Sequence, residues 1–279
     1  MKKFSIEPGQ ALLVPAVIAI VLGLSSCEKI VSIDLNKTNP HMVIEGIVTD
    51  QSIPDSVTLS MSGNYFEPSL SFPPVPNALV TIADNLGTID TLKEDTPGTY
   101  RSSSVRGMPG KMYTLTVVAD GNVYHAVSSM PEKVVIDSLY VTPFRAFDGD
   151  VGYYLYLMFK DPPTSGNYYR VNLGISRTIS PDSITGQRYH LFSDKLTNGN
   201  EITLRMRTGR SVVTGDTLTV ELLSIDRASY DYFNTLNDIL TSDRAPTSLA
   251  PTNPNTNLSD GALGYFSAFT IDKRTIVLH

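Results

Sequence analysis

Apolar and polar residues alternate along most of the chain after about residue 40. The clearest runs of this kind predict strands at residues 57–61, 113–117, 169–175, 202–206 and 218–222. A period of two places one face of a strand on a core and the other in water. Many short strands of this kind, separated by Pro and Gly, favour a mainly β fold built from antiparallel sandwiches.

Two local signals add detail to this pattern. Asp120-Gly121 lies between two alternating runs and predicts a tight hairpin, because both residues tolerate positive φ. A different spacing, with Phe233, Leu236 and Leu240 on one face, predicts a helix near residues 227–241 that packs on a sheet. Asp226 or Ser229 is the expected cap at its start.

A domain boundary is expected near residues 130–136, where Pro131, Glu132 and Lys133 interrupt the β pattern. We therefore expect a β-sandwich domain at residues 41–133 and a β-rich domain with the helix at residues 134–279. The first domain has Gly shortly before Tyr at expected strand edges, as in Gly98-Thr99-Tyr100. This arrangement is typical of immunoglobulin-like or transthyretin-like sandwiches, in which Tyr closes the end of the core.

The start of the chain indicates an export signal. Lys2 and Lys3 precede a largely apolar run at residues 11–24, which is too short to span a bilayer as a helix. The run ends in Leu24-Ser25-Ser26-Cys27, which fits the cleavage box of a bacterial lipoprotein. We expect a signal peptide at residues 1–26, a lipid on Cys27 and a tether at residues 27–40. The alternative is an ordinary secretory signal with an incidental cysteine.

Composition narrows the partners and the chemistry. The net charge of −6 disfavours binding to nucleic acid through the overall field of the protein. Cys27 is the only cysteine, so its acylation would leave no thiol for a disulfide, a metal site or a nucleophile.

No group of residues spells out a reaction. The four histidines have no metal-ligand spacing, and Asp148-Gly149-Asp150 offers too few oxygens for calcium, so that a tight turn is favoured there. Gly-x-Ser-x-Gly does not occur. We predict no catalytic residue, metal or cofactor, although paired carboxylates that meet only in the fold leave a hydrolase open as the alternative. The four histidines are His41, His125, His190 and His279.

Two surfaces are candidates for binding. Five tyrosines could form a platform for sugars, although a role in the core and its rim is favoured. Arg170, Arg205 and Arg207 lie on the polar faces of two expected strands and would form a docking face if those strands were neighbours. The alternative is a solvated sheet face. The loop at residues 245–260, with Pro246 and Pro254, is long enough to join such a face. The tyrosines are Tyr153, Tyr154, Tyr156, Tyr168 and Tyr169.

Several short segments, taken in order, resemble the Bacteroidota lipoproteins grouped as domain of unknown function 4249. They include the segments 27–35, 42–46, 78–82, 98–100, 110–115 and 136–139, and Asn257-Leu258-Ser259-Asp260-Gly261-Ala262-Leu263-Gly264-Tyr265-Phe266. In the last segment, Asp260 and Ala262 depart from a plain Gly-Gly form.

The resemblance implies a lipoprotein of the outer membrane, often linked with TonB-dependent transporters, and it brings no catalytic residues. We expect a non-catalytic binding or accessory component that is held to the membrane through Cys27, with the leaflet left open. The alternative function is an envelope hydrolase acting on glycan, ester or peptide substrates.

Overall fold

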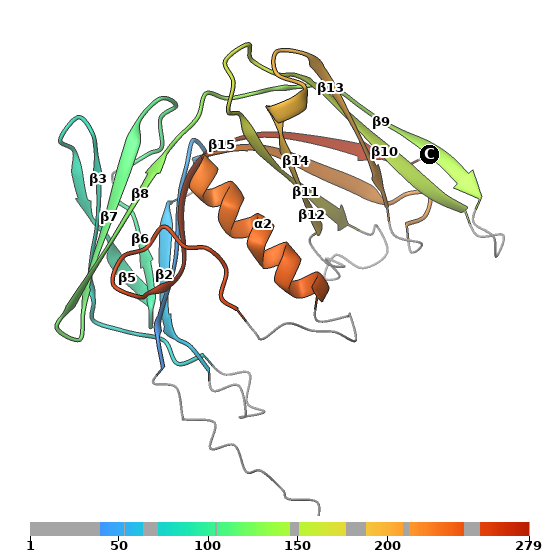
Figure 1. The fold of residues 1–279 in the computed structure, drawn as a ribbon. Coiled ribbons are helices and arrows are strands. Elements are labelled where there is room, and N and C mark those ends of the chain that lie inside the picture. The colour runs from blue at the N-terminus through green and yellow to red at the C-terminus, as the bar shows by residue number, and fades with distance from the viewer. Residues whose placement is uncertain are drawn as a thin grey trace, which may run out of the picture. The chain divides into compact units, whose positions relative to one another are not determined.

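The computed structural model describes residues 40–52, 54–63, 72–103, 105–145, 151–176, 188–208, 212–242 and 252–278. These residues form a mainly β structure with three sheets and the helix α2 (Figure 1). The signal peptide, Cys27 and most of the tether lie outside the described residues, as does Asp148-Gly149-Asp150.

The first core lies between two sheets. One is the four-stranded sheet β4-β3-β7-β8, and the other is the β15-β1-β2-β6-β5 part of an eight-stranded sheet. Ile44 and Leu59 from the larger sheet pack with Ile82 and Leu115 from the smaller one, all with no exposed surface. The strands are β1 (Met42–Thr49), β2 (Ser56–Met61), β3 (Leu79–Asp84), β4 (Ile89–Thr91), β5 (Lys93–Thr96), β6 (Thr99–Arg101), β7 (Met112–Ala119) and β8 (Asn122–Ser129).

The second core lies between the three-stranded sheet β13-β10-β9 and the other end of the eight-stranded sheet, in the order β12-β11-β14-β15. Leu157 and Phe159 from β10 pack with Val171 and Val220 from β11 and β14. The elements are β9 (Ile136–Arg145), β10 (Val151–Lys160), β11 (Tyr168–Ser176), β12 (Arg188–Ser193), the 3-10 helix η1 (Asp194–Leu196), β13 (Glu201–Arg207), β14 (Thr217–Ile225), α2 (Arg227–Ser242) and β15 (Leu263–Val277).

Local patterns predict these strands well. Each alternating run lies inside an observed strand, as Tyr113, Leu115 and Val117 in β7 illustrate with their buried side chains. Asp120 and Gly121 have φ values of 50° and 78° and join β7 to β8, which confirms the hairpin. Both residues therefore adopt the positive φ that a two-residue hairpin turn of this type requires.

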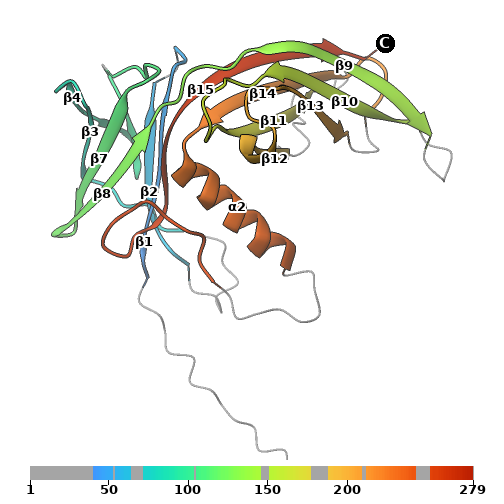
Figure 2. The ribbon, with the colours of Figure 1, turned by 45° about the horizontal axis from the view of Figure 1, so that its top comes forward.

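Strand β15 belongs to both cores. It pairs parallel with β1 from Leu263 to Phe269 and then antiparallel with β14 from Thr270 to Val277. Figure 2 shows this strand running from the first group of strands into the second. The expectation of antiparallel sandwiches therefore does not hold for the pairing of β1 with β15, although β1 pairs antiparallel with β2. Alternation within a strand carries no information about the direction of its neighbour.

Near the expected boundary at residues 130–136 the chain passes from the first core to the second, since Met130 packs in the first core and Val134 in the second. The C-terminal segment is different. Leu258, Ala262 and Phe266 pack in the first core, although the pattern of the sequence assigns them to the second domain. By their contacts the described residues form one compact unit.

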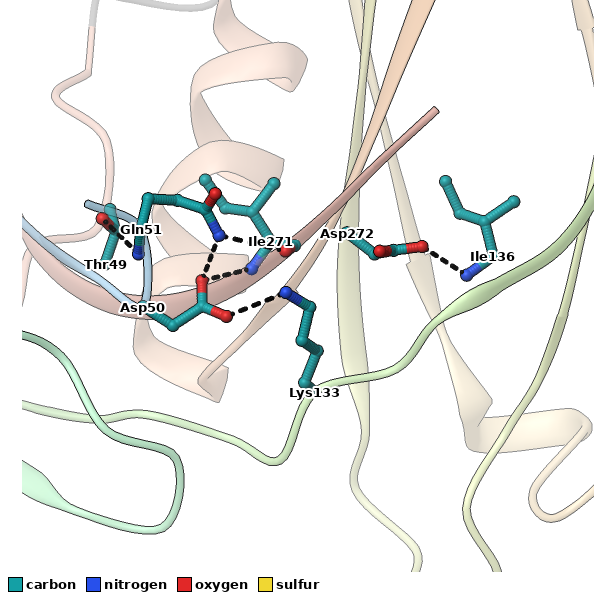
Figure 3. A network of polar contacts seen from close by, with 7 residues as sticks. All are labelled: Thr49, Asp50, Gln51, Lys133, Ile136, Ile271 and Asp272. Carbon is teal, nitrogen blue, oxygen red and sulfur yellow. Dashed lines mark hydrogen bonds and ion pairs between the residues drawn. The ribbon is translucent and has the colours of Figure 1, made fainter. Parts of the chain in front are cut away.

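Polar side chains extend the pairing where β1 ends beside β15 (Figure 3). The Ile271 amide donates to Asp50 Oδ1 at 2.9 Å, and Gln51 Nε2 donates to the Ile271 carbonyl at 3.2 Å. The other oxygen of Asp50 accepts a bond from Lys133 Nζ at 3.0 Å, in the connection between the two cores. These contacts connect the end of β1, strand β15 and the connecting segment at one point.

Helix α2 begins at a cap that also binds the first core. Asp226 Oδ1 accepts a bond from the Ser229 amide at 2.8 Å, which satisfies one of the free N–H groups of the first turn. Its Oδ2 accepts bonds from Ser128 Oγ at 2.7 Å and from the Ser129 amide at 3.1 Å. Of the two caps expected, Asp226 is confirmed.

Phe233 is buried in the helix face that was expected from the spacing, whereas Leu240 near the C-terminal end is 55% exposed. The helix contacts β11, β12 and β15, and it lies beside the eight-stranded sheet in both ribbon views. Its buried face is therefore limited to the first turns.

Gly264 gives a test of the pairing between β1 and β15. Its φ is +98°, and a Cβ atom at this position would overlap the carbonyl oxygen of Ile44 on the paired strand. We expect Gly264→Ala to lower the free energy of unfolding by more than about 2 kcal/mol, because it adds backbone strain and a clash. Chemical denaturation of the purified protein measures this effect.

Gly261→Ala is the matched control. Gly261 also has a positive φ, of +73°, but no atom lies within 4 Å of the position of its Cβ. This variant should lose only the roughly 1–2 kcal/mol that positive φ costs an L-residue. Equal losses for the two variants would contradict a close approach of Gly264 to Ile44.

Candidate functional site

The three arginines predicted to form a docking face do not share one. Arg170 is in β11, which lies between β12 and β14, whereas Arg205 and Arg207 are in β13, which lies beside β10. Val171 and Met206, their neighbours in sequence, both point into the second core. Arg170 therefore projects from one outer face of this pair of sheets, and Arg205 and Arg207 project from the opposite face. The prediction of one shared face is wrong.

Arg205 and Arg207 lie over aromatic rings from the other two strands of their sheet, β10 and β9. The Arg205 guanidinium lies 4.9 Å from the ring centroid of Tyr154, and that of Arg207 lies 4.5 Å from that of Phe144. Beside them, Tyr140 and Tyr156 stack with centroids 4.8 Å apart. This exposed face is therefore a pair of cations on an aromatic sheet surface.

The tyrosines considered as a sugar platform occupy several different places. The rings of Tyr154 and Tyr156 stack against neighbouring side chains on the outer face of β10. Tyr169 is buried in the second core and donates a hydrogen bond to Asp161 Oδ1 at 2.5 Å, while Tyr168 packs on Tyr230 of α2. The structure therefore does not bring these five rings together on one surface.

A cavity of about 240 Å³ lies beside Arg170, on the face of the eight-stranded sheet that α2 contacts. Its lining comes from four adjacent strands, β1, β15, β14 and β11, and from Phe233 of the helix. Most of these side chains are apolar or aromatic. The full lining is Ile47, Thr49, Arg170, Asn172, Glu221, Leu223, Ile225, Phe233, Tyr265, Ser267, Phe269 and Ile271.

Arg170 is the cation of this cavity. Its guanidinium carbon lies 4.1 Å from the ring centroid of Phe233 and 4.6 Å from that of Tyr189. Burial lowers the pKa of Arg170 from its ordinary value, and the nearby Tyr265, Tyr189 and Glu221 oppose that shift. The side chain still carries its charge at any physiological pH.

A chain of hydrogen bonds holds Arg170 in place. Its Nε donates to Asn172 Oδ1 at 3.0 Å, and Asn172 Nδ2 donates to Glu221 Oε2 at 3.2 Å. The other oxygen of Glu221 accepts a bond from Lys273 Nζ at 3.1 Å. Asn172 thus lies between Arg170 and the nearest acidic side chain of the cavity, whose charge is matched by Lys273.

Sequence reasoning found Arg170 but missed its setting. Asn172 can be placed from the sequence, two positions along the same polar face. Nothing in the sequence shows that Glu221 and Tyr189 lie opposite Asn172 on the paired strands. The aromatic face of α2 was predicted to pack on a sheet, and Phe233 does so. The missing information was the strand order.

The loop at residues 245–260 is described only from residue 252 onward. There, Asn257 bonds to both backbone groups of Phe266, with its Nδ2 donating at 2.8 Å and its Oδ1 accepting at 3.0 Å. The Ser259 amide donates to the His125 carbonyl at 2.9 Å. The end of this loop is therefore held against β15 and β8.

Buried carboxyl groups occur away from the cavity as well. Asp55 is 2% exposed and accepts a bond from the Thr49 amide at 2.7 Å. Burial is the largest cause that raises its pKa, to about 7, and the nearby Asp90 adds to the shift. Asp90 itself accepts bonds from Ser102 Oγ and the Ser103 amide. These contacts fix the ends of strands, and neither carboxyl lines the cavity.

Two further observations concern metals and membranes. Within the described ranges, no three His, Cys, Asp or Glu side chains are close enough to share a metal ion. The same ranges contain no helix with the length and apolar character needed to cross a bilayer.

The described residues place the chain in the class of mainly β proteins, with three sheets and the α-helix α2. Within that class, it belongs to the family described as Domain of unknown function (DUF4249), whose model matches residues 28–275. The resemblance to that family is thereby confirmed.

Other comparisons add little to the family match. No curated protein sequence matches the chain. Among solved structures, the adhesin InvE of Yersinia pseudotuberculosis is similar at 18% identity, with a TM-score of 0.21. That match covers 68% of this chain and 56% of the adhesin chain, so it leaves a large part of the adhesin unmatched.

Asp55 makes the stability of the protein depend on pH. Its folded pKa of about 7 lies above the ordinary 3.8, so the folded state holds a proton that the unfolded state has released between these values. The contribution of Asp55 is therefore fully present below about pH 4 and is lost as pH rises to about 7. We expect Asp55→Asn to remove this loss, worth up to roughly 1.4 kcal/mol per pH unit in that window.

Urea denaturation of both proteins at intervals from pH 4 to pH 8 measures the difference. Asp84→Asn is the control, because Lys111 lowers the pKa of Asp84 to about 2. The stability that Asp84 contributes is lost only as pH falls from about 4 to 2, so its variant should differ from wild type by a constant amount in the tested window. A constant difference for Asp55→Asn as well would refute the assignment.

Proposed function

We propose that this protein is a non-catalytic binding component of the bacterial outer membrane, anchored by a lipid on Cys27. The observation that carries the binding role is the cavity beside Arg170, where Arg170, Asn172 and Glu221 project into a lining that is otherwise mostly apolar or aromatic. A few polar groups in an apolar cavity are typical of sites that recognise a ligand.

The lining also favours binding over chemistry. Glu221 is the acidic side chain of the cavity, and Lys273 and Asn172 hold both of its oxygens. A general base must be within hydrogen-bond reach of the proton that it takes, and both oxygens of Glu221 are instead engaged by side chains of the protein. Envelope hydrolysis of glycans, esters or peptides is the alternative that this argument disfavours.

The membrane anchor rests on the sequence. Leu24-Ser25-Ser26-Cys27 follows the apolar run at residues 11–24, and the family match begins at residue 28, immediately after Cys27. Acyl chains stabilise membrane association by about 0.8 kcal/mol for each buried CH₂ group, so a multiply acylated cysteine is a firm anchor. The resemblance to the lipoproteins of this family also implies that the protein comes from a Bacteroidota species and is located at the outer membrane.

The fold and the partner complete the proposal. We assign the sheets around the first core to an immunoglobulin-like or transthyretin-like sandwich, a class that suits a spacer or binder. The proposed partner is a TonB-dependent transporter, as the family resemblance implies. Arg205 and Arg207, which project together from β13, are the proposed docking residues.

The anchor is tested by Cys27→Ala. The variant should incorporate no fatty-acid analogue in metabolic labelling and should leave the membrane fraction, because the thiol that receives the lipid is gone. Cys27→Ser is a second variant that keeps the size of the side chain and should behave in the same way. Label retained on either protein would exclude lipidation at this residue.

The docking role of Arg205 and Arg207 is tested by reversing both charges to Glu. Capture of partners from native outer membranes should fall several-fold and lose its salt sensitivity, because exposed charges attract partners over roughly 10 Å at 0.1 M salt. Lys93→Glu with Lys195→Glu is the control, since both residues are exposed basic groups on other strands and turns. Equal capture by wild type and both double variants would leave this face without a docking role.

A further inference from the structure

The charge of Arg170 is incompletely satisfied by the protein. Its Nε has a partner in Asn172, but the described residues provide no hydrogen-bond acceptor for its two terminal nitrogens. A guanidinium has five N–H donors, so four of them are left to solvent or to a ligand. Placing a charge among apolar groups is costly unless it is paired.

The stacked rings offset only part of that cost. Phe233 and Tyr189 attract the cation through their faces, which contributes about 0.5–2 kcal/mol for each ring. Neither ring provides an acceptor in the plane of the guanidinium. The hydroxyl of Tyr189 is also buried and has no hydrogen-bond partner among the described residues. The terminal nitrogens of Arg170 and the hydroxyl of Tyr189 thus have no hydrogen-bond partner among the described residues.

The electrostatic balance of the cavity points to an anion. Glu221 is shared with Lys273 at 3.1 Å and bonds to Asn172, so its charge is already matched. Of the two charged side chains in the lining, Glu221 has both oxygens engaged, whereas the Arg170 guanidinium keeps N–H donors without a partner among the described residues. An anion there would meet a fixed donor fork, because Asn172 and the two rings hold the guanidinium in one orientation.

The rest of the lining indicates the size and polarity of the part of the ligand that lies away from Arg170. Ile47, Leu223, Phe269 and Ile271 present apolar surface from three adjacent strands. The volume of about 240 Å³ lies below the range of roughly 300–1,000 Å³ that is usual for drug-sized ligands. The ligand must therefore be small and mostly apolar.

We propose that this cavity binds a small organic carboxylate, with its carboxylate on the Arg170 guanidinium and its apolar body over the side chains of β1, β14 and β15. A planar carboxylate matches the guanidinium fork with two parallel hydrogen bonds, which favours it over other anions of the same size. The inference rests on the proposed binding role and names the class of ligand.

The test compares 3-phenylpropionate with its neutral isostere 3-phenylpropionamide by isothermal titration calorimetry on the full purified chain at pH 7.5. The carboxylate should bind at least tenfold more tightly than the amide. Arg170→Gln should abolish that preference. Arg205→Gln should retain it, because Arg205 also lies over a ring but on the opposite outer face.

Glu221→Gln provides a test in the opposite direction. It removes the negative charge closest to the site and leaves Lys273 without its ion-pair partner, so the carboxylate should bind several-fold more tightly. This variant keeps the inference testable if Arg170→Gln fails to fold, since a gain in affinity requires a folded site.

Equal affinity for acid and amide, a preference retained in Arg170→Gln, or no binding of either probe would overturn the inference. Labelling at Cys27 and capture of membrane partners have separate readouts. Failure of the carboxylate test with success of those experiments would therefore reject this ligand class and leave the anchored binding role standing.

Discussion

The structure depends on one strand that serves two cores. β15 pairs with β1 along its first half and with β14 along its second half, so it completes a sheet of eight strands. Without it, the β1 edge and the β14 edge would each expose a row of unpaired backbone groups. The two cores are therefore joined by backbone hydrogen bonds as well as by a connecting segment.

The cavity exists because of that continuity. Its lining combines Ile47 of β1 and Arg170 of β11, which can share one face only because β15 and β14 lie between them in the same sheet. The polar contacts of Asp50 and Gln51 with Ile271 lie at one border of this region. At another, Ser229 Oγ of the helix bonds to Ser267 Oγ of β15 at 2.7 Å. The site is thus bordered by elements whose positions are fixed by hydrogen bonds.

Much of the local structure could be predicted from the sequence, and most of the tertiary arrangement could not. Alternation identified strands such as β7 and β11, and Asp120-Gly121 identified a hairpin, because these depend on residues that are neighbours in the chain. The parallel pairing of β15 with β1 depends on residues that are far apart, and alternation says nothing about it. The prediction of one shared docking face was wrong for the same reason: it required β11 and β13 to be neighbours, and strand order cannot be read from alternation.

The candidate site shows the same limit. Arg170 was visible as a basic residue on a polar strand face, which is ordinary, and only the structure shows that Phe233 and Tyr189 enclose it. Two features of helix α2 could be predicted from the sequence, namely the cap at Asp226 and the face with Phe233 that packs on the sheet. The identity of the strands beneath it depended on the order of the sheet, which no local pattern encodes.

The position of β15 also governs the order in which the chain can fold. Val43 pairs with Leu263, so the first core stays incomplete until residue 263 and the rest of β15 have been synthesised. Contacts between residues this distant in sequence are slow to form, because the intervening chain must be ordered first. Until then, the β1 strand is an open edge that invites pairing with other chains. A protein of this design must be kept apart from its own copies until β15 has been synthesised and has paired with β1.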